Sequence, residues 1–216
     1  MGTRLHTVRI VSTGEEIPVG KIFCLGRNYA EHALEMNEIS SADKGHPIIF
    51  LKPPTALLRP GSPIKYPPMT KNLHHEIELV ALLGEESSVL AYGIGLDMTM
   101  RDVQEEAKSR GLPWSVAKGF DGSAPVSDFV LAEDLPNVYD LEMKLWVNGK
   151  LRQHSSTQNM IFTIEDIIEF LQSIFTLEFG DLIFSGTPAG VGVVHPGDVI
   201  EAEITGIGKI SYQVVE

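Results

Sequence analysis

Two glutamates, Glu76 and Glu78, lie inside the apolar run LHHEIELVALLG of residues 73–84. In a β-strand alternate side chains share a face, so both carboxylates point one way while Ile77 and Leu79 point the other way. Two like charges side by side on a sheet face repel each other, and each also loses hydration if that face is enclosed. A bound cation would remove both problems. A face open to water would not need one, and this pattern alone leaves both interpretations open.

A third acid, Asp97, ends the next predicted strand, SVLAYGIGLDMT over residues 88–99. On adjacent strands the three acids would offer carboxylate oxygens to one ion, and all-oxygen ligation favours Mg²⁺, Mn²⁺ or Ca²⁺ over zinc. Three protein ligands leave positions for water and a chelating substrate. His74 shares the predicted glutamate face and is a further candidate ligand, whereas His75 faces the other side. A hydrogen-bonded structural role is the more common one for such histidines.

A histidine–glutamate pair lies in the segment GRNYAEHALEMN, where we predict a short helix over residues 27–37. His32 and Glu35 are three residues apart and would be neighbours on one helix face. Such a carboxylate can orient an imidazole and raise its basicity, which suits a base that activates water. A solvated helix face explains the same spacing equally well.

Several other catalytic signatures are missing from the sequence. It contains no G-x-S-x-G, H-E-x-x-H or C-x-x-C motif. The glycine-rich stretch GTPAGVG of residues 186–192 lacks the Lys-Ser/Thr pair of a phosphate loop, so we interpret it as a tight turn near a site.

The elements that must position these side chains read as a β-rich α+β fold with few helices. Short strands are predicted on both sides of a TGEE turn within residues 1–20, and apolar strands over 21–26 and 48–52, the latter buried. After residue 180, the runs DLIFSG, GDVIEAEI and KISYQVV predict further strands.

Two helices are predicted after the glutamate strand. Thr99 is expected to cap a helix over MRDVQEEAKSR that ends at Gly111. The clearest helical pattern is FTIEDIIEFLQSIF over residues 162–175, with Thr163 as the cap and Asp166 completing a capping box. Its predicted apolar stripe consists of Ile164, Ile167, Ile168, Leu171, Ile174 and Phe175.

Composition narrows the class of protein. The 216 residues carry a formal charge of −12, which argues against nucleic acid or an anionic membrane as the main partner. The one cysteine, Cys24, excludes an intrachain disulfide and reads as a buried core thiol. We find neither a signal peptide nor a transmembrane run, so we expect a cytoplasmic protein, or one in an organelle if a transit peptide was removed.

Seven ordered motifs then resemble the fumarylacetoacetate hydrolase family, especially its small single-domain acylpyruvase members. The resemblance runs from about residue 20 to the C-terminus. Its motifs are GRNYAEHALEM, FLKPPTAL, HHEIELVALLG, GLDMTMRDVQ, PWSVAKGFDGSAPVS, MIFTIEDIIEFLQSIFTLEFGDLIFSGTPAGVG and PGDVIEAEI. It implies a mixed-sheet β-roll in one catalytic domain over residues 1–216, with short strands in 1–20 and a lid segment over 27–46, and a homodimer.

The resemblance also implies roles for individual residues. Glu76, Glu78 and Asp97 match the metal ligands, normally for Mg²⁺ or Mn²⁺. His32 and Glu35 match the dyad on the lid, and Lys118 matches a lysine near the substrate. Three further residues match positions that line the pocket: Arg27, Gln104 and Thr187. Lys52 matches a motif lysine whose role stays open.

The activity implied is divalent-metal-dependent cleavage of a C–C bond in a small 2-oxo acid. Acylpyruvate or fumarylpyruvate hydrolysis and oxaloacetate decarboxylation all leave an enolate of pyruvate, whose charge the metal and Lys118 would stabilise. The alternative is an isomerase or decarboxylase of the 2-hydroxyhepta-2,4-diene-1,7-dioate type, from aromatic catabolism. A non-catalytic protein that binds metal or a small molecule would have no use for His32, Glu35 and Lys118.

Overall fold

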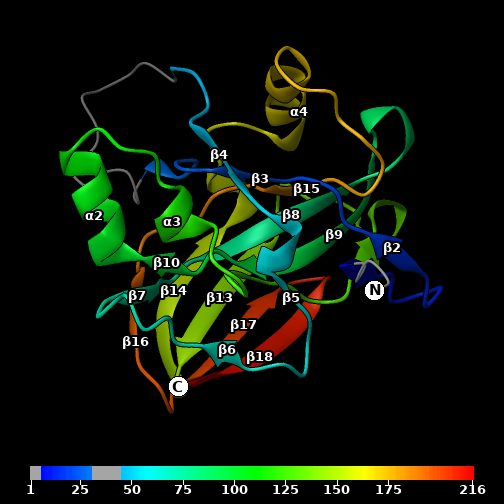
Figure 1. The fold of residues 1–216 in the computed structure, drawn as a ribbon. Coiled ribbons are helices and arrows are strands. Elements are labelled where there is room, and N and C mark those ends of the chain that lie inside the picture. The colour runs from blue at the N-terminus through cyan, green and yellow to red at the C-terminus, as the bar shows by residue number, and fades with distance from the viewer. Residues whose placement is uncertain (1–5, 31–44) are drawn as a thin grey trace, which may run out of the picture.

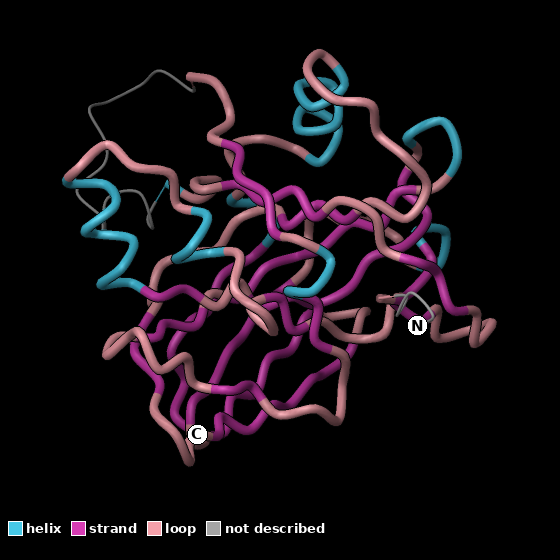
Figure 2. The backbone as a smooth tube through the Cα atoms, in the orientation of Figure 1, coloured by secondary structure: helices cyan, strands magenta, loops and turns pink. Residues whose placement is uncertain are grey.

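The computed structural model describes residues 6–30 and 45–216. Two β-sheets form most of the fold and the helices lie at its periphery (Figure 1, Figure 2). The strands of the larger sheet are β3 (Ile22–Leu25), β4 (Ile49–Lys52), β8 (Ile77–Leu83), β9 (Val89–Leu96), β12 (Val130–Leu131) and β15 (Leu182–Phe184). They lie in the order β12-β9-β8-β15-β3-β4. Only β15 and β3 pair in parallel within it, so the sheet is mixed, as predicted.

The second sheet has five strands in the order β14-β13-β17-β18-β6. They are β6 (Ile64–Lys65), β13 (Glu142–Val147), β14 (Lys150–Ser156), β17 (Val199–Ile204) and β18 (Gly208–Val215). Three small sheets complete the described strands: β1 (Thr7–Arg9) with β2 (Glu16–Pro18), β5 (Leu57–Leu58) with β11 (Ala124–Pro125), and β7 (Leu73–His75) between β10 (Thr99–Met100) and β16 (Gly192–Val194).

The described helices are α2 (Arg101–Ser109), α3 (Ser115–Lys118) and α4 (Ile164–Gln172), with short 3₁₀ turns at 54–56, 85–87, 132–134 and 157–159. The predicted capping box of α4 is confirmed. Thr163 Oγ1 accepts from Asp166 N at 3.1 Å, and the Asp166 carboxylate accepts from Thr163 N at 2.9 Å. The predicted stripe is wrong at Ile174, which is 58% exposed because the helix ends before it.

Two further expectations need correction. Thr99 does not cap α2, because it belongs to β10 and its hydroxyl donates to the Asp97 carbonyl at 3.1 Å; Met100 is the N-cap residue. The strand at residues 48–52 is not buried as predicted. As β4 it forms an edge of the larger sheet, where Leu51 is 43% exposed and Lys52 points inward.

The central strand β8 is buried along its whole length, which explains its almost continuous apolar sequence. Its odd-numbered residues from 77 to 83 join a large core that contains residues of both sheets. Val80 and Leu82 join a smaller core with residues of β1, β3 and β15. Alternation places Glu78 on the Val80 side, so one end of the smaller core carries a buried acid.

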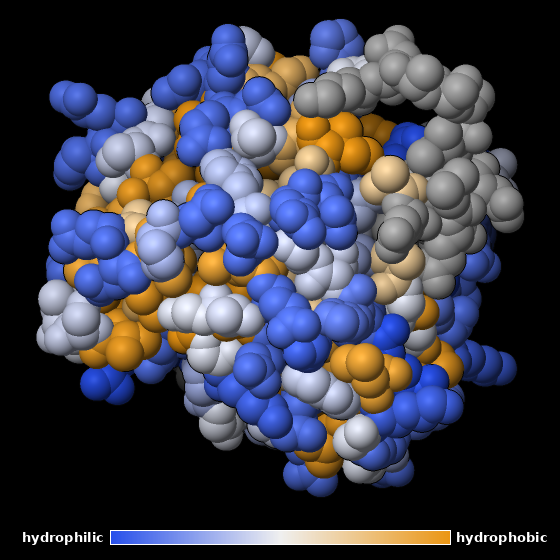
Figure 3. Space-filling view, turned by 180° about the vertical axis from the view of Figure 1, so that it is seen from behind, coloured by the Kyte–Doolittle hydropathy of each residue, from blue (hydrophilic) through white to orange (hydrophobic). Residues whose placement is uncertain are grey.

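The surface seen from behind shows apolar residues scattered among hydrophilic ones (Figure 3). Among residues 6–30 and 45–216, no helix is long and apolar enough to cross a membrane.

Candidate functional site

Three acids from two adjacent strands converge in the interior. Glu76 lies at the break between β7 and β8, Glu78 lies in β8, and Asp97 directly follows β9. The backbone brings them together, because Asp97 N donates to Glu76 O at 2.9 Å and Glu78 pairs with Gly95. Each offers one carboxylate oxygen, and these oxygens lie within 4.8 Å of one another. At 4%, 1% and 0% exposure all three are buried, so the open, wet face considered for the glutamate pair is excluded.

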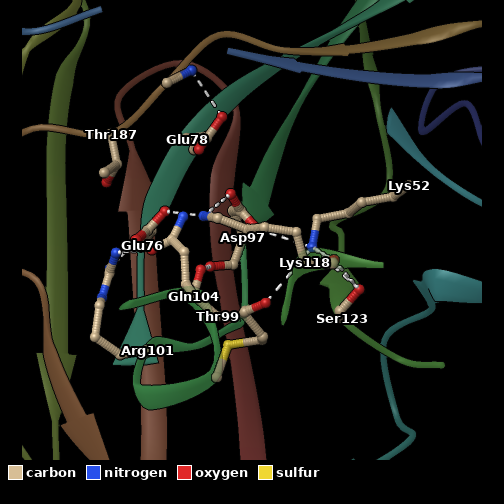
Figure 4. A network of polar contacts seen from close by, with 12 residues as sticks. Lys52, Glu76, Glu78, Asp97, Thr99, Arg101, Gln104, Lys118, Ser123 and Thr187 are labelled. Atoms are coloured by element: carbon tan, nitrogen blue, oxygen red, sulfur yellow. Dashed lines mark hydrogen bonds and ion pairs between the residues drawn. The ribbon is translucent and has the colours of Figure 1, made fainter. Parts of the chain in front are cut away.

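Three buried cations surround this acid cluster (Figure 4). Lys118 Nζ lies between two of the acids, 2.8 Å from Glu76 Oε2 and 2.5 Å from Asp97 Oδ2. The Arg101 guanidinium pairs with Glu76 through Nη2 and donates from Nη1 to Gln104 Oε1 at 2.7 Å. Lys52 Nζ is 2.8 Å from Asp97 Oδ1. The structure thus brings the predicted residues Lys118 and Gln104 to the acid cluster.

Lys52, whose role the sequence left open, has a fully buried side chain. Besides Asp97, its ammonium donates to Ser123 Oγ at 3.0 Å and to the Lys118 carbonyl. Lys52 therefore fixes the position of the Asp97 carboxylate relative to the backbone of Lys118.

The electrostatics of the cluster follow from burial. Burial, with the charges of Asp97 and Glu76, raises the pKa of Glu78 well above the usual range of a carboxyl. Burial alone would lower the pKa of Lys118, but the charges of Asp97 and Glu76 outweigh it and the pKa is raised. Lys118 is therefore an ammonium at neutral pH.

A divalent cation fits this set of residues. Within the described part of the chain, Glu78 has no ion-pair partner, and its Oε2 accepts one hydrogen bond, from Gly186 N at 2.7 Å. A buried carboxylate without a counter-charge is costly, and a cation shared with Glu76 and Asp97 would remove that cost. The oxygen-only donor set suits Mg²⁺, Mn²⁺ or Ca²⁺.

The loop after β15 closes the other side of the cluster. Gly186 has φ +92°, and a Cβ there would lie 2.7 Å from Asn28 Cβ, so only glycine fits where the loop passes Glu78. Thr187 follows at 4% exposure, and its Oγ1 accepts from Gln153 Nε2 at 2.8 Å. The glycine-rich stretch is therefore a turn at the site, as expected.

The two histidines beside Glu76 have hydrogen-bonded positions outside the acid cluster. His74 Nε2 pairs with Asn72 Oδ1 at 2.9 Å, and His75 Nδ1 with Gln153 Oε1 at 3.2 Å. Burial lowers the pKa of each to about 4, so both are neutral at pH 7. His74 is not among the groups whose ligand atoms converge in the described residues.

The remaining predicted site residues are His32, Glu35 and Arg27. His32 and Glu35 lie outside the described residues, as does most of the segment over 27–46, so the predicted dyad and lid stay predictions. Arg27 is half-buried two residues after the end of β3, and its role also stays a prediction.

Cys24 is a buried core residue, as expected. Burial raises the pKa of its thiol well above the ordinary value, which makes it unreactive.

Two buried residues at the site were missed from the sequence. Arg101 carries no local signal beyond its place in TMRD at the start of α2, and its Nε has no hydrogen-bond partner among the described residues. Gln153 lies in the polar strand KLRQHSS, where a buried amide has no distinguishing pattern. Both are recognised only when distant segments are placed side by side.

Comparisons with known proteins identify the family of this chain. Residues 21–215 match the family model described as fumarylacetoacetate (FAA) hydrolase C-terminal. The human protein named oxaloacetate tautomerase FAHD1, mitochondrial, is 47% identical over 203 residues, covering 89% of this chain and 90% of the human protein.

Two solved structures are also similar. The fumarylpyruvate hydrolase from Pseudomonas aeruginosa, in complex with Mn²⁺ and pyruvate, has a TM-score of 0.94 at 36% identity and covers 100% of this chain and 97% of its own. The 2-hydroxyhepta-2,4-diene-1,7-dioate isomerase from Mycobacterium marinum has a TM-score of 0.78 at 35% identity, with 94% and 81% covered. The fold expected from the motifs is thereby confirmed, and the chain belongs to the fumarylacetoacetate hydrolase C-terminal family.

Proposed function

We propose that this chain is a divalent-metal-dependent enzyme that acts on small 2-oxo acids, by C–C bond cleavage or decarboxylation that generates an enolate of pyruvate. The observation that carries the proposal is the convergence of Glu76, Glu78 and Asp97 in the interior, with the Lys118 ammonium beside them. A family member of the same fold has been solved with Mn²⁺ and pyruvate together.

In this proposal the three acids hold a divalent cation, Mg²⁺ or Mn²⁺, with Ca²⁺ as a further candidate. The cation would supply fixed positive charge next to the negative charge that develops as the bond breaks. Lys118 would donate hydrogen bonds to the same developing oxyanion, because it is a buried ammonium already aimed at the cluster. Arg101 Nε, which has no hydrogen-bond partner among the described residues, would donate to the substrate carboxylate. Gln104 would orient Arg101, and Thr187 and Arg27 would contact substrate.

Hydrolysis also needs a base for water. We assign this to His32, oriented by Glu35, from their spacing and the resemblance. His32→Ala should lose hydrolysis by at least about 100-fold and keep its Mn²⁺ affinity. A full hydrolytic rate in that variant would refute the assignment.

A second candidate is keto–enol tautomerisation of oxaloacetate. The observation that favours it is the name shared by relatives from Bos taurus and Homo sapiens at 46% and 47% identity. This reaction also moves charge onto the 2-oxo oxygen, but it breaks no C–C bond and needs no water. The dienedioate isomerase is a third candidate, supported by the structural neighbour from Mycobacterium marinum.

One experiment separates the candidates. Protein stripped of metal is assayed with and without Mg²⁺ or Mn²⁺ on an acylpyruvate, fumarylpyruvate, enol-oxaloacetate and a 2-hydroxy-diene-dioate. Metal-dependent release of pyruvate supports cleavage or decarboxylation. Faster loss of the enol absorbance of oxaloacetate without pyruvate identifies a tautomerase, and a shift of the diene spectrum without pyruvate identifies an isomerase. Metal binding without turnover of any compound would refute all three.

Three further properties belong to the same proposal. We expect residues 1–216 to form one catalytic domain, the protein to be a homodimer and its location to be the cytoplasm, although the animal relatives are named as mitochondrial. Light scattering on purified protein tests the dimer, and cell fractionation tests the location.

A further inference from the structure

Gln153 is a fully buried amide on a largely exposed strand. Its neighbours in β14, Arg152 and His154, are exposed, whereas Gln153 has 0% exposure. Burying an amide is costly unless its donors and acceptor find partners. The partners of Gln153 come from two segments far apart in the chain, residues 75–77 and 187–188, and both border the acid cluster.

Two backbone partners fix the orientation of this amide, because one can only donate a hydrogen bond and the other can only accept one. Ile77 N, a backbone donor, lies 3.0 Å from Gln153 Oε1, and the Pro188 carbonyl, which can only accept, lies 2.8 Å from Nε2. Turning the amide over would set donor against donor and acceptor against acceptor. His75 Nδ1, at 3.2 Å from Oε1, must therefore be the protonated ring nitrogen.

This orientation sets the direction of the Thr187 hydroxyl. Gln153 Nε2 donates to Thr187 Oγ1 at 2.8 Å, so the hydroxyl accepts on this side and its own proton points elsewhere. Within the described residues, that hydroxyl donates to no group. Figure 4 shows Thr187 on the side of the network where Glu76 and Glu78 lie.

The same amide ties the loop to the strand that carries the two glutamates. Ile77 lies between Glu76 and Glu78, while Thr187 and Pro188 belong to the loop. The loop also packs closely on β14, since a Cβ on Gly190 would lie 2.1 Å from the Arg152 carbonyl oxygen.

We propose that Gln153 is a positioning residue that presents the Thr187 hydroxyl as a hydrogen-bond donor to a negatively charged oxygen of the substrate. The inference rests on the proposed function, because it takes the site to bind a 2-oxo acid anion. Gln153 itself touches no substrate. Its effect passes through Thr187, and it selects ligands that carry an acceptor at this point over ligands that carry a donor.

The test is the near-isosteric variant Gln153→Glu. The introduced carboxylate can still accept from Ile77 N, but its second oxygen can donate neither to Thr187 nor to the Pro188 carbonyl. The hydroxyl would then turn to donate to the carboxylate and present only lone pairs to the ligand. With Mn²⁺ saturating, we expect the dissociation constant for oxalate, an unreactive analogue, to rise about 10- to 100-fold, as for the loss of a hydrogen bond to a charged group. Mn²⁺ binding without oxalate should not weaken.

The added negative charge could itself repel oxalate, so a double-mutant cycle with Thr187→Val is needed. If the effect passes through the hydroxyl, Gln153→Glu should weaken oxalate binding less than about threefold in the Thr187→Val background. An uncharged variant, Gln153→Met, keeps the test available if the carboxylate prevents folding. Without the Nε2 donor the Thr187 hydroxyl loses its fixed direction, so Gln153→Met should weaken oxalate binding. In the Thr187→Val background the same substitution should leave oxalate binding unchanged.

Equal losses in both backgrounds would overturn the inference, as would an unchanged oxalate affinity in Gln153→Glu. These results leave the proposed function standing. A native protein that binds Mn²⁺ but neither oxalate nor pyruvate would instead refute the proposed function and the inference with it.

Discussion

Replacing Lys52 by methionine is expected to lower the free energy of unfolding by about 3–5 kcal/mol. The Lys52 side chain is 0% exposed and that of Asp97 is 1% exposed, with 2.8 Å between Nζ and Oδ1. Asp97 keeps Lys118 at 2.5 Å from Oδ2, but Lys118 is shared with Glu76 and Oδ1 loses the ammonium that pairs with it. The buried carboxylate is then only partly compensated, and this penalty is the source of the estimate. Methionine retains most of the side-chain volume, so a cavity contributes little.

The hydrogen bonds of the ammonium point the same way. Loss of its donation to Ser123 and to the Lys118 carbonyl leaves polar atoms that must find other partners in a closed interior. For a chain of 216 residues, the expected loss corresponds to a decrease in Tm of roughly 6–20 °C.

Urea unfolding of metal-free protein, followed by circular dichroism, measures this effect. Lys150→Met is the matched control, because Lys150 is exposed at the start of β14 and its loss should cost less than about 0.5 kcal/mol. A loss below about 1 kcal/mol in Lys52→Met would refute the reasoning, since Lys118 alone would then suffice to compensate the buried Asp97 carboxylate.

Three further changes have expected outcomes. Because the pKa of Glu78 is raised, the folded state keeps this proton to higher pH than the unfolded state, and the stability of the metal-free protein should fall as pH rises above the ordinary carboxyl range. Glu78→Gln should remove that fall, raise the free energy of unfolding by roughly 0.5–2 kcal/mol at pH 8 and abolish Mn²⁺ binding. Urea midpoints at pH 5 and 8 and a Mn²⁺ titration measure these effects. An unchanged pH slope would contradict it. Gly186→Ala should cost about 1–3 kcal/mol and weaken Mn²⁺ binding, because φ is +92° and the new Cβ meets Asn28; a native urea midpoint would contradict this. Thr163→Ala should cost about 1 kcal/mol in the same assay through loss of the α4 cap, while Thr205→Ala, in an exposed turn, should cost almost nothing.

Local patterns could be predicted well from the sequence. The capping box at Thr163 and Asp166 depends on residues three apart, and the strand that carries Glu78 depends on an alternation of two; the break in pairing at Glu76 was not predicted. The acid cluster could be predicted because a short connection joins β8 to β9, which leaves few ways for these two strands to pair.

Contacts between distant segments could not be predicted in the same way. Lys52, Arg101 and Gln153 reach the site from β4, α2 and β14, and no local pattern marks a polar side chain that folding will bury. The exposure of β4 has the same cause. An edge strand and a central strand can have the same apolar sequence, and only the order of strands in the sheet distinguishes them.

The charges of the site also account for an anionic substrate in a chain whose formal charge is −12. The six charged side chains of the cluster are Glu76, Glu78, Asp97, Lys52, Arg101 and Lys118. With all six ionised, as cation binding to Glu78 would require, the side-chain charges sum to zero. A divalent cation held by the acids would then give this buried region an excess of two positive charges, which is costly in a closed interior. A 2-oxo dicarboxylate carries two negative charges and would offset that excess. Net charge therefore says little about the ligand here, because the field at the site would be set by these six side chains and the cation that the acids would hold.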